Sequence, residues 1–147
     1  MKKKFFLSLT IICLIFLNNP VHSLKNKIVA NVGNEIISSY ELKNKIMVTL
    51  FLNKQELTQD NINNIQETAI RFLIDEKIKR SEILKYKIPI ESNENTRNYL
   101  SQISSKYNTD IEGLKKIFDQ NKLDFDIYVS EIRTQFAWNQ LIYNLYK

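Results

Sequence analysis

Residues 1–23 set the limits of what this chain can fold into, because they have the order of a secretory signal peptide. Lysines precede an apolar run over residues 5–17, and the helix-breaking sequence Asn-Asn-Pro follows it. Cleavage by signal peptidase is predicted after Ser23. The apolar run is shorter than the roughly 20 residues that a transmembrane helix needs, and the alternative to cleavage is an N-terminal anchor that is kept. The sequence therefore predicts one folded domain over residues 24–147 that works outside the cytoplasm.

The composition of residues 24–147 argues against several kinds of chemistry. The whole chain has 21 Lys and Arg against 16 Asp and Glu, a net charge of +5. Three lysines and no acid lie in residues 1–23, which leaves +2, and a charge this small argues against a nucleic-acid partner. The single cysteine, Cys13, and the single histidine, His22, lie there too. We therefore expect no disulfide, thiolate, histidine base or zinc site, and no stable membrane span once the signal is removed.

A β-hairpin is predicted at the start of the domain. Two short runs rich in Val and Ile, residues 27–32 and 35–38, flank Gly33-Asn34. A Gly-Asn pair between extended segments is typical of a hairpin turn. Because Gly33 is one of two glycines in the chain, we expect it to supply a positive φ at the turn. A two-stranded hairpin is marginal alone and must pack on helices.

Helices are predicted for most of the remaining chain, because apolar residues recur there at helical spacing. The first is expected to be capped by Ser38 or Ser39 and the second by Thr58 or Asp60, with Pro89 ending the second. The expected ranges are about 39–53, 61–87, 93–107, 111–120 and 125–147. The other expected caps are Ser92, the cluster Asn108-Thr109-Asp110, and Asp124. The predicted fold class is mainly α, a multi-helical domain with a short N-terminal β-hairpin.

The remaining charged residues give little support for catalysis. Paired carboxylates occur at Asp75-Glu76, at Asp124 with Asp126, and at Asp60 with Glu67. A glycosidase-like site would place two of them face to face across a cleft, but helix caps and solvated helix faces explain the pairs more simply. A glycine-rich phosphate loop is not expected either, because Gly33 and Gly113 are far apart. We therefore predict a non-enzyme without cofactor or metal.

Five short segments share their order and spacing with a known family. They are Ile28–Leu42, Phe72–Ile78, Tyr86–Ile90, Asn108–Leu114 and Tyr128–Arg133. Together they resemble the N-terminal chaperone module of the SurA family of periplasmic chaperones, over about Lys27 to Tyr143. The resemblance implies a hairpin plus several helices, related to the peptide-binding domains of trigger-factor-type chaperones. It also implies that the protein holds unfolded outer-membrane protein clients without ATP, in the periplasm of a Gram-negative bacterium.

The sequence departs from that family in two respects. SurA-like proteins usually continue into parvulin-type prolyl isomerase domains, after which a C-terminal helix returns to complete the N-terminal module. The sequence reaches Lys147 without either feature, so prolyl isomerase activity is not expected. The core is expected to be open on one side, where a second copy of the chain or a partner protein would supply the missing helix.

Candidate contact residues follow from the needs of a chaperone that holds clients. Such a protein exposes apolar surface, and methionine and aromatic side chains adapt to varied partners. The candidate peptide-binding residues are Met47, Leu50, Phe51, Phe118, Tyr128 and Trp138. The alternative for each is a place in the core. A second hypothesis is a non-catalytic assembly subunit that dimerises or docks a separate partner through its C-terminal helix. The docking surface would be an apolar stripe of that helix, formed by Trp138, Leu141, Ile142 and Leu145.

Overall fold

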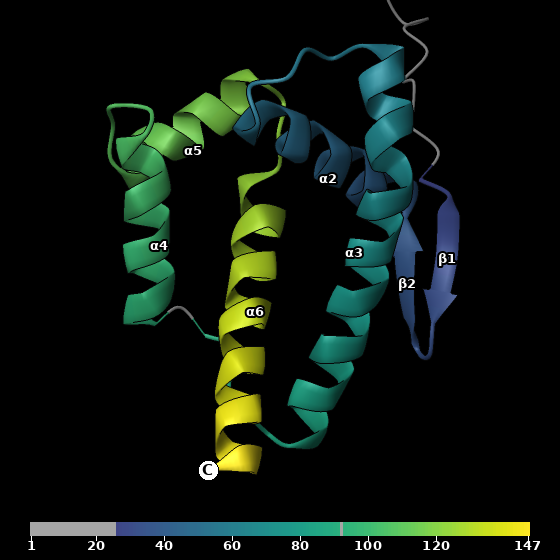
Figure 1. Cartoon of the computed structure of the whole chain (residues 1–147), viewed down its shortest axis with the longest axis vertical. Coiled ribbons are helices and arrows are strands. Elements are labelled where there is room, and N and C mark those ends of the chain that lie inside the picture. The colour runs from purple at the N-terminus through teal and green to yellow at the C-terminus, as the bar shows by residue number, and fades with distance from the viewer. Residues whose placement is uncertain (1–25, 92) are drawn as a thin grey trace, which may run out of the picture.

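The structure is a computed structural model that describes residues 26–91 and 93–147. Within these ranges the chain forms a hairpin followed by five helices (Figure 1). The elements are β1 (Ile28–Val32), β2 (Glu35–Ser38), α2 (Ser39–Leu52), α3 (Gln59–Lys85), α4 (Glu94–Ser105), α5 (Ile111–Gln120) and α6 (Phe125–Tyr146). The predicted mainly helical fold with an N-terminal hairpin is confirmed. The predicted signal peptide and the predicted cap Ser92 lie outside the described residues.

Each described helix begins at a polar residue whose side chain accepts a hydrogen bond from the first helical turn. The caps are Ser38, Thr58, Asn93, Asp110 and Asp124. At α2 the bond is reciprocal, because the Glu41 carboxylate also accepts from the Ser38 N–H at 2.8 Å. These bonds satisfy amide groups that a helix start leaves unpaired. The expected caps of α2, α3, α5 and α6 are confirmed, and Asn93 caps α4.

Helices α2 to α5 end without glycine. Each is followed by a residue with positive φ, namely Lys54, Lys87, Asn108 and Lys122. After α3 the Lys87 N–H donates to the Leu84 carbonyl, and the Ile88 N–H donates to the Ile83 carbonyl. This Schellman arrangement satisfies the last helical carbonyls and turns the chain back. The helix therefore ends at Lys85, earlier than predicted, and the turn rather than Pro89 ends it.

The hairpin lies against the helices through one strand. β1 and β2 pair antiparallel, and Gly33 in the turn has a φ of 60°, as predicted. Ile37 of β2 is fully buried, and β2 lies between β1 and α3 (Figure 1). β1 is therefore the outer strand.

The helices surround α6. α3 and α6 run side by side in the same direction, and α2 lies across the ends at which both begin (Figure 1). α4 and α5 cover α6 on the side away from α3. This arrangement gives α2 one side toward the core and one side toward solvent.

The core consists of one large and two small apolar clusters. The large cluster joins α2, α4, α5 and α6, and Phe118 lies within it, with ring centroids of Phe125 and Tyr128 at 5.2 Å and of Phe51 at 5.7 Å. We call this cluster the Phe118 core. The small clusters are Ile46 with Leu50 and Ala69, between α2 and α3, and Ile83 with Ala137 and Leu141, between α3 and α6.

Candidate functional site

The solvent-facing side of α2 from Ser39 to Met47 is bordered by two hollows, and we call this surface the α2 face. The hollows have volumes of about 250 and 320 Å³, and both are lined by Ser39, Lys43 and Met47. Val48 of α2 faces the Phe118 core and Leu50 packs on Ala69 of α3, and the α2 face between them stays open. The α2 face is therefore one surface with Met47 between two depressions.

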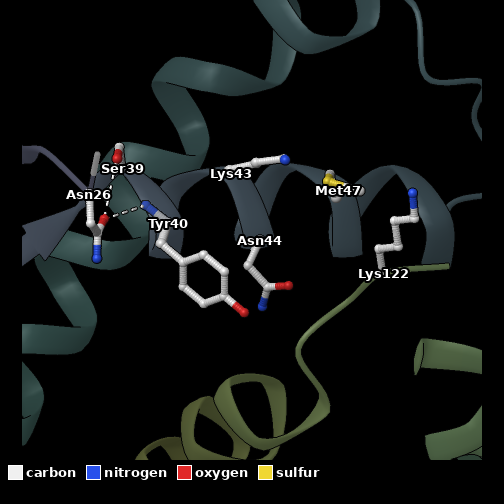
Figure 2. A pocket seen from close by; sticks show the side chains of 7 residues that line it. All are labelled: Asn26, Ser39, Tyr40, Lys43, Asn44, Met47 and Lys122. Carbon is white, nitrogen blue, oxygen red and sulfur yellow. Dashed lines mark hydrogen bonds between the residues drawn. The ribbon is translucent and has the colours of Figure 1, made fainter. Parts of the chain in front are cut away.

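The first hollow has a polar floor that ties α2 to α6. Asn44 is buried, and its amide accepts from the Asp124 N–H at 2.8 Å and donates to the Asp124 carbonyl at 3.3 Å. The Tyr40 hydroxyl donates to the Asp124 carboxylate at 2.9 Å, and this bond raises the pKa of Tyr40. Figure 2 shows Asn26 at one end of the hollow and Met47 with Lys122 at the other. The polar groups of the floor thus bind one another.

The second hollow is mostly apolar. Its apolar lining residues come from α2, from the start of α3 and from the connection between them, and they are Leu42, Ile46, Met47, Leu57 and Ile62. Leu57 lies in the connection and is 62% exposed. Exposed apolar side chains gathered around a depression mark a binding surface more often than isolated ones do. The α2 face can therefore bury apolar side chains of a partner.

The structure places the six predicted contact residues in different surroundings. Met47 alone lies on the α2 face. Leu50, Phe118 and Tyr128 are buried, and Phe51 and Trp138 are half-buried. Phe51 stacks on Tyr107 with ring centroids 5.3 Å apart, while Trp138 packs against the cluster of Ile83 and Leu141.

The burial of three predicted residues corrects the expectation that they face a client. Phe118, Tyr128 and Leu50 fill the spaces where helices meet, because large apolar side chains give the greatest gain when a small domain closes its core. Conversely, Leu57 and Tyr40 line the hollows of the α2 face but were not among the predicted contact residues. Leu57 stands alone in a polar connection, so no periodic pattern marked it. Tyr40 shares helical spacing with Met47 and Phe51 along α2, and that apolar stripe was the available signal.

A layer of charged side chains lies between α2, α3 and α6, and we call it the charged layer. Its members are Glu41, Lys45, Glu76, Lys77 and Glu131. Lys45 Nζ lies 2.7 Å from a Glu131 oxygen, Lys77 Nζ lies 2.8 Å from a Glu41 oxygen, and Thr134 Oγ1 donates to Glu76 at 3.2 Å. The layer thus joins three helices through paired charges.

The carboxylates of this layer respond in opposite ways to their surroundings. Burial raises the pKa of Glu131, although Lys45 opposes the shift. Burial would also raise the pKa of Glu41, but hydrogen bonds from Lys77 and Ser38 bring it below its usual value. For Lys77, burial would lower the pKa, and Glu41 and Glu76 together raise it. Each charged side chain of the layer has a partner of opposite charge. This arrangement is typical of residues that hold helices together.

Residues 26–91 and 93–147 contain no group of three or more His, Cys, Asp or Glu side chains placed to hold a metal ion. None of their helices combines the length and the apolar character needed to cross a membrane.

The fold and the α2 face define a hairpin-and-helix domain with an apolar surface depression and paired interior charges. The chain belongs to the PT26-6P family, whose helical domain matches residues 42–134, more than half of the chain. The matched segment runs from the first turn of α2 into α6 and does not include the hairpin. No curated protein and no solved structure gives a significant match.

Proposed function

We propose that this protein is a SurA-like, ATP-independent chaperone of the periplasm that holds unfolded outer-membrane protein clients on the α2 face. The observation that carries the proposal is the pair of hollows that meet at Met47. An unbranched thioether side chain adapts its shape to many apolar partners. The signal-peptide pattern of residues 1–23 supports the compartment.

The chemistry of the α2 face supports a role in binding rather than catalysis. Its buried polar residue, Asn44, is engaged with the Asp124 backbone in joining α2 to α6. Its apolar residues are placed at an open surface, where they contact side chains without demanding one shape. Lys43 and Lys122 lie at the border of the first hollow, where they would favour clients with acidic residues beside apolar ones. We infer that the protein binds and releases clients without changing them.

The test is suppression of aggregation of a urea-unfolded outer-membrane β-barrel protein, followed by light scattering after dilution. The purified protein should slow aggregation, and Leu57→Gln should weaken this effect because it removes an apolar contact from the second hollow. Leu84→Gln is the matched control, since Leu84 is 57% exposed but lies on α3 away from the α2 face. Equal activity of both variants would overturn the assignment to the α2 face, and no effect of the unmodified protein would overturn the function.

A second candidate function is the assembly subunit, and one observation favours it. Apolar side chains are exposed at the end of the molecule where α3 and α6 terminate, namely Leu84, Tyr86, Tyr143, Leu145 and Tyr146. The predicted docking stripe is mostly covered, because Leu141 is buried and Trp138 and Ile142 are half-buried. A second copy or a partner would therefore dock on the helix ends instead. Sedimentation velocity over a range of concentrations tests self-association, which Leu84→Gln should weaken and Leu57→Gln should not.

A further inference from the structure

The hairpin exposes an edge strand that lacks the usual protection. Among the described residues β1 pairs with β2 alone, so alternate residues of β1 direct their N–H and C=O groups away from the sheet. Natural edge strands are commonly blocked by charged residues or proline, and Ile28–Val32 contains neither. A register irregularity interrupts the start of the strand, between Ile28 and Ala30, and leaves the rest regular. Within the part of the chain that the structure describes, the outer edge of β1 from Ala30 to Val32 is therefore unpaired.

Three exposed side chains of the hairpin are apolar. Ile28 is 62% exposed and Ile36 is 49% exposed, and Val29 is exposed beside them. Exposed apolar residues on an unpaired strand favour association with another extended chain. The unpaired edge and the exposed apolar side chains together allow another extended chain to pair with β1.

The start of β1 lies beside the α2 face. The Ser39 N–H donates to the Lys27 carbonyl at 2.7 Å, and the Lys27 N–H donates to Ser39 Oγ at 3.0 Å. Asn26 lines the first hollow and accepts from the Tyr40 N–H at 3.2 Å (Figure 2). The start of β1 therefore borders the first hollow, so a chain paired with β1 would have one end beside the α2 face.

We propose that the free edge of β1 binds an extended segment of an unfolded polypeptide as an added β-strand, continuous with the part of that polypeptide held on the α2 face. This inference rests on the proposed function and adds that the client is recognised through its main chain. Strand addition takes its affinity from main-chain hydrogen bonds, and apolar side chains at alternate positions add to it. Such recognition suits a chaperone with many clients.

The surface area buried on binding favours a client over a second copy of this chain as the occupant of the edge. Strand β1 has five residues, and pairing two such hairpins alone buries much less than the roughly 1,000 Å² typical of a specific interface. An unfolded client gains the hollow of the α2 face in addition to the strand. The continuity from Asn26 to Met47 therefore favours an extended client.

The test is amide hydrogen exchange of the purified protein, with a short peptide of alternating valine and threonine that ends in lysines. Bound peptide should slow exchange at alternate amides of β1 by at least about tenfold, because those groups become hydrogen-bonded. Ile28→Lys should abolish this protection, since a lysine on an edge opposes strand addition. Gln102→Lys is the control, because it adds the same charge at an exposed position of α4, and it should leave the protection unchanged.

The outcomes separate this inference from the proposed function. Aggregation suppression without protection of β1 amides would overturn strand addition and leave the α2 face as the site. Protection that depends on protein concentration and needs no peptide would overturn the client assignment in favour of a second copy. Protection by the peptide that survives Ile28→Lys would place the strand elsewhere and overturn the edge assignment.

Discussion

The two sides of α6 show two different ways of holding a helix in place. Toward α4 and α5 it contributes Tyr128, Val129 and Ile132 to the Phe118 core, where contacts are apolar and aromatic. Toward α2 and α3 it contributes Glu131 to the charged layer and Thr134, which donates to Glu76, in addition to a small apolar cluster with Ile83. Apolar burial gives most of the stability of a fold but does not depend on direction. Paired charges depend on direction, because a displaced partner leaves a buried charge uncompensated.

The two sides of α6 contribute differently to the α2 face. The Phe118 core holds α5 and α6 together beneath α2, and its loss would remove the support of the whole surface. The charged layer joins Lys45 of α2 to α6 and Glu41 of α2 to α3. It therefore fixes how α2 lies across the two long helices, and with it the two hollows. We infer that the core supplies stability and that the layer supplies alignment.

The largest expected effect is in the Phe118 core. Phe118→Ala should lower the free energy of unfolding by about 3–5 kcal/mol, because it removes a fully buried ring and leaves a cavity. Phe72→Ala is the control, since Phe72 is exposed and its main contact is Lys45 Nζ at 3.2 Å from the ring centroid. That variant should cost about 1 kcal/mol. Urea denaturation followed by circular dichroism measures both, and equal losses would contradict the division drawn above.

The next effect is in the charged layer. Lys45→Met should lower the free energy of unfolding by about 3 kcal/mol, because Glu131 is left as a buried charge without its partner. The double variant Lys45→Met/Glu131→Leu should recover much of that loss. Arg71→Met is the control, since the ion pair of Arg71 with Glu67 is exposed, and it should change stability by less than about 0.5 kcal/mol. A double variant no more stable than Lys45→Met would show that the pair contributes net stability.

The pH dependence of stability sharpens the comparison within the layer. The pKa of Glu131 is raised above 4.5 in the folded protein. Between pH 4.5 and that raised pKa, the folded state therefore binds more protons than the unfolded state. Its contribution is therefore present below about pH 4.5 and is lost as the pH rises through the folded pKa. The pKa of Glu41 is lowered below 4.5, so its contribution is present above that value and is lost as the pH falls through the folded pKa.

Replacing each carboxyl by an amide should therefore change the pH profile in opposite directions. Glu41→Gln should reduce the loss of stability on acidification below about pH 4.5, and Glu131→Gln should reduce the loss on raising the pH above it. Thermal unfolding at a series of pH values from 3 to 7, at fixed ionic strength, measures both slopes. Parallel profiles for the two variants would show that the two sites do not differ in the way described.

Local signals made much of the fold predictable. Ser38, Thr58 and Asp124 cap helices because a short side-chain acceptor at a helix start satisfies neighbouring amides, which is a property of a few adjacent residues. Gly33 marks the hairpin turn for an equally local reason. These caps and the turn depend little on what packs against them, so the sequence alone was sufficient to predict them.

The candidate site depends on contacts between distant residues, and this is why it was only partly predictable. Helix α2 is apolar on two faces, and its sequence does not say which face α3 and α6 will cover. Met47 remained at the surface, whereas Leu50 was covered by α3. The alignment is set by pairs such as Lys45 with Glu131, whose members are separated by most of the domain. Leu57 carries no periodic signal at all, because it lies between helices.

The smallest expected effect is at a helix end, where backbone conformation dominates. Lys87 follows α3 with a φ of 55°, a conformation that costs an L-residue roughly 1–2 kcal/mol relative to glycine. Lys87→Gly should therefore stabilise the protein by about 1 kcal/mol. The gain is reduced because glycine has a greater chain entropy in the unfolded state. Lys85→Gly, two positions earlier and inside the last turn of α3, should destabilise by about 1 kcal/mol because glycine is a poor helix former. Lys85→Gly also removes an exposed ion pair with Glu82, which contributes little. Stabilisation by Lys87→Gly would come from the backbone, and destabilisation by both variants would show that the Lys87 side chain contributes a contact of its own.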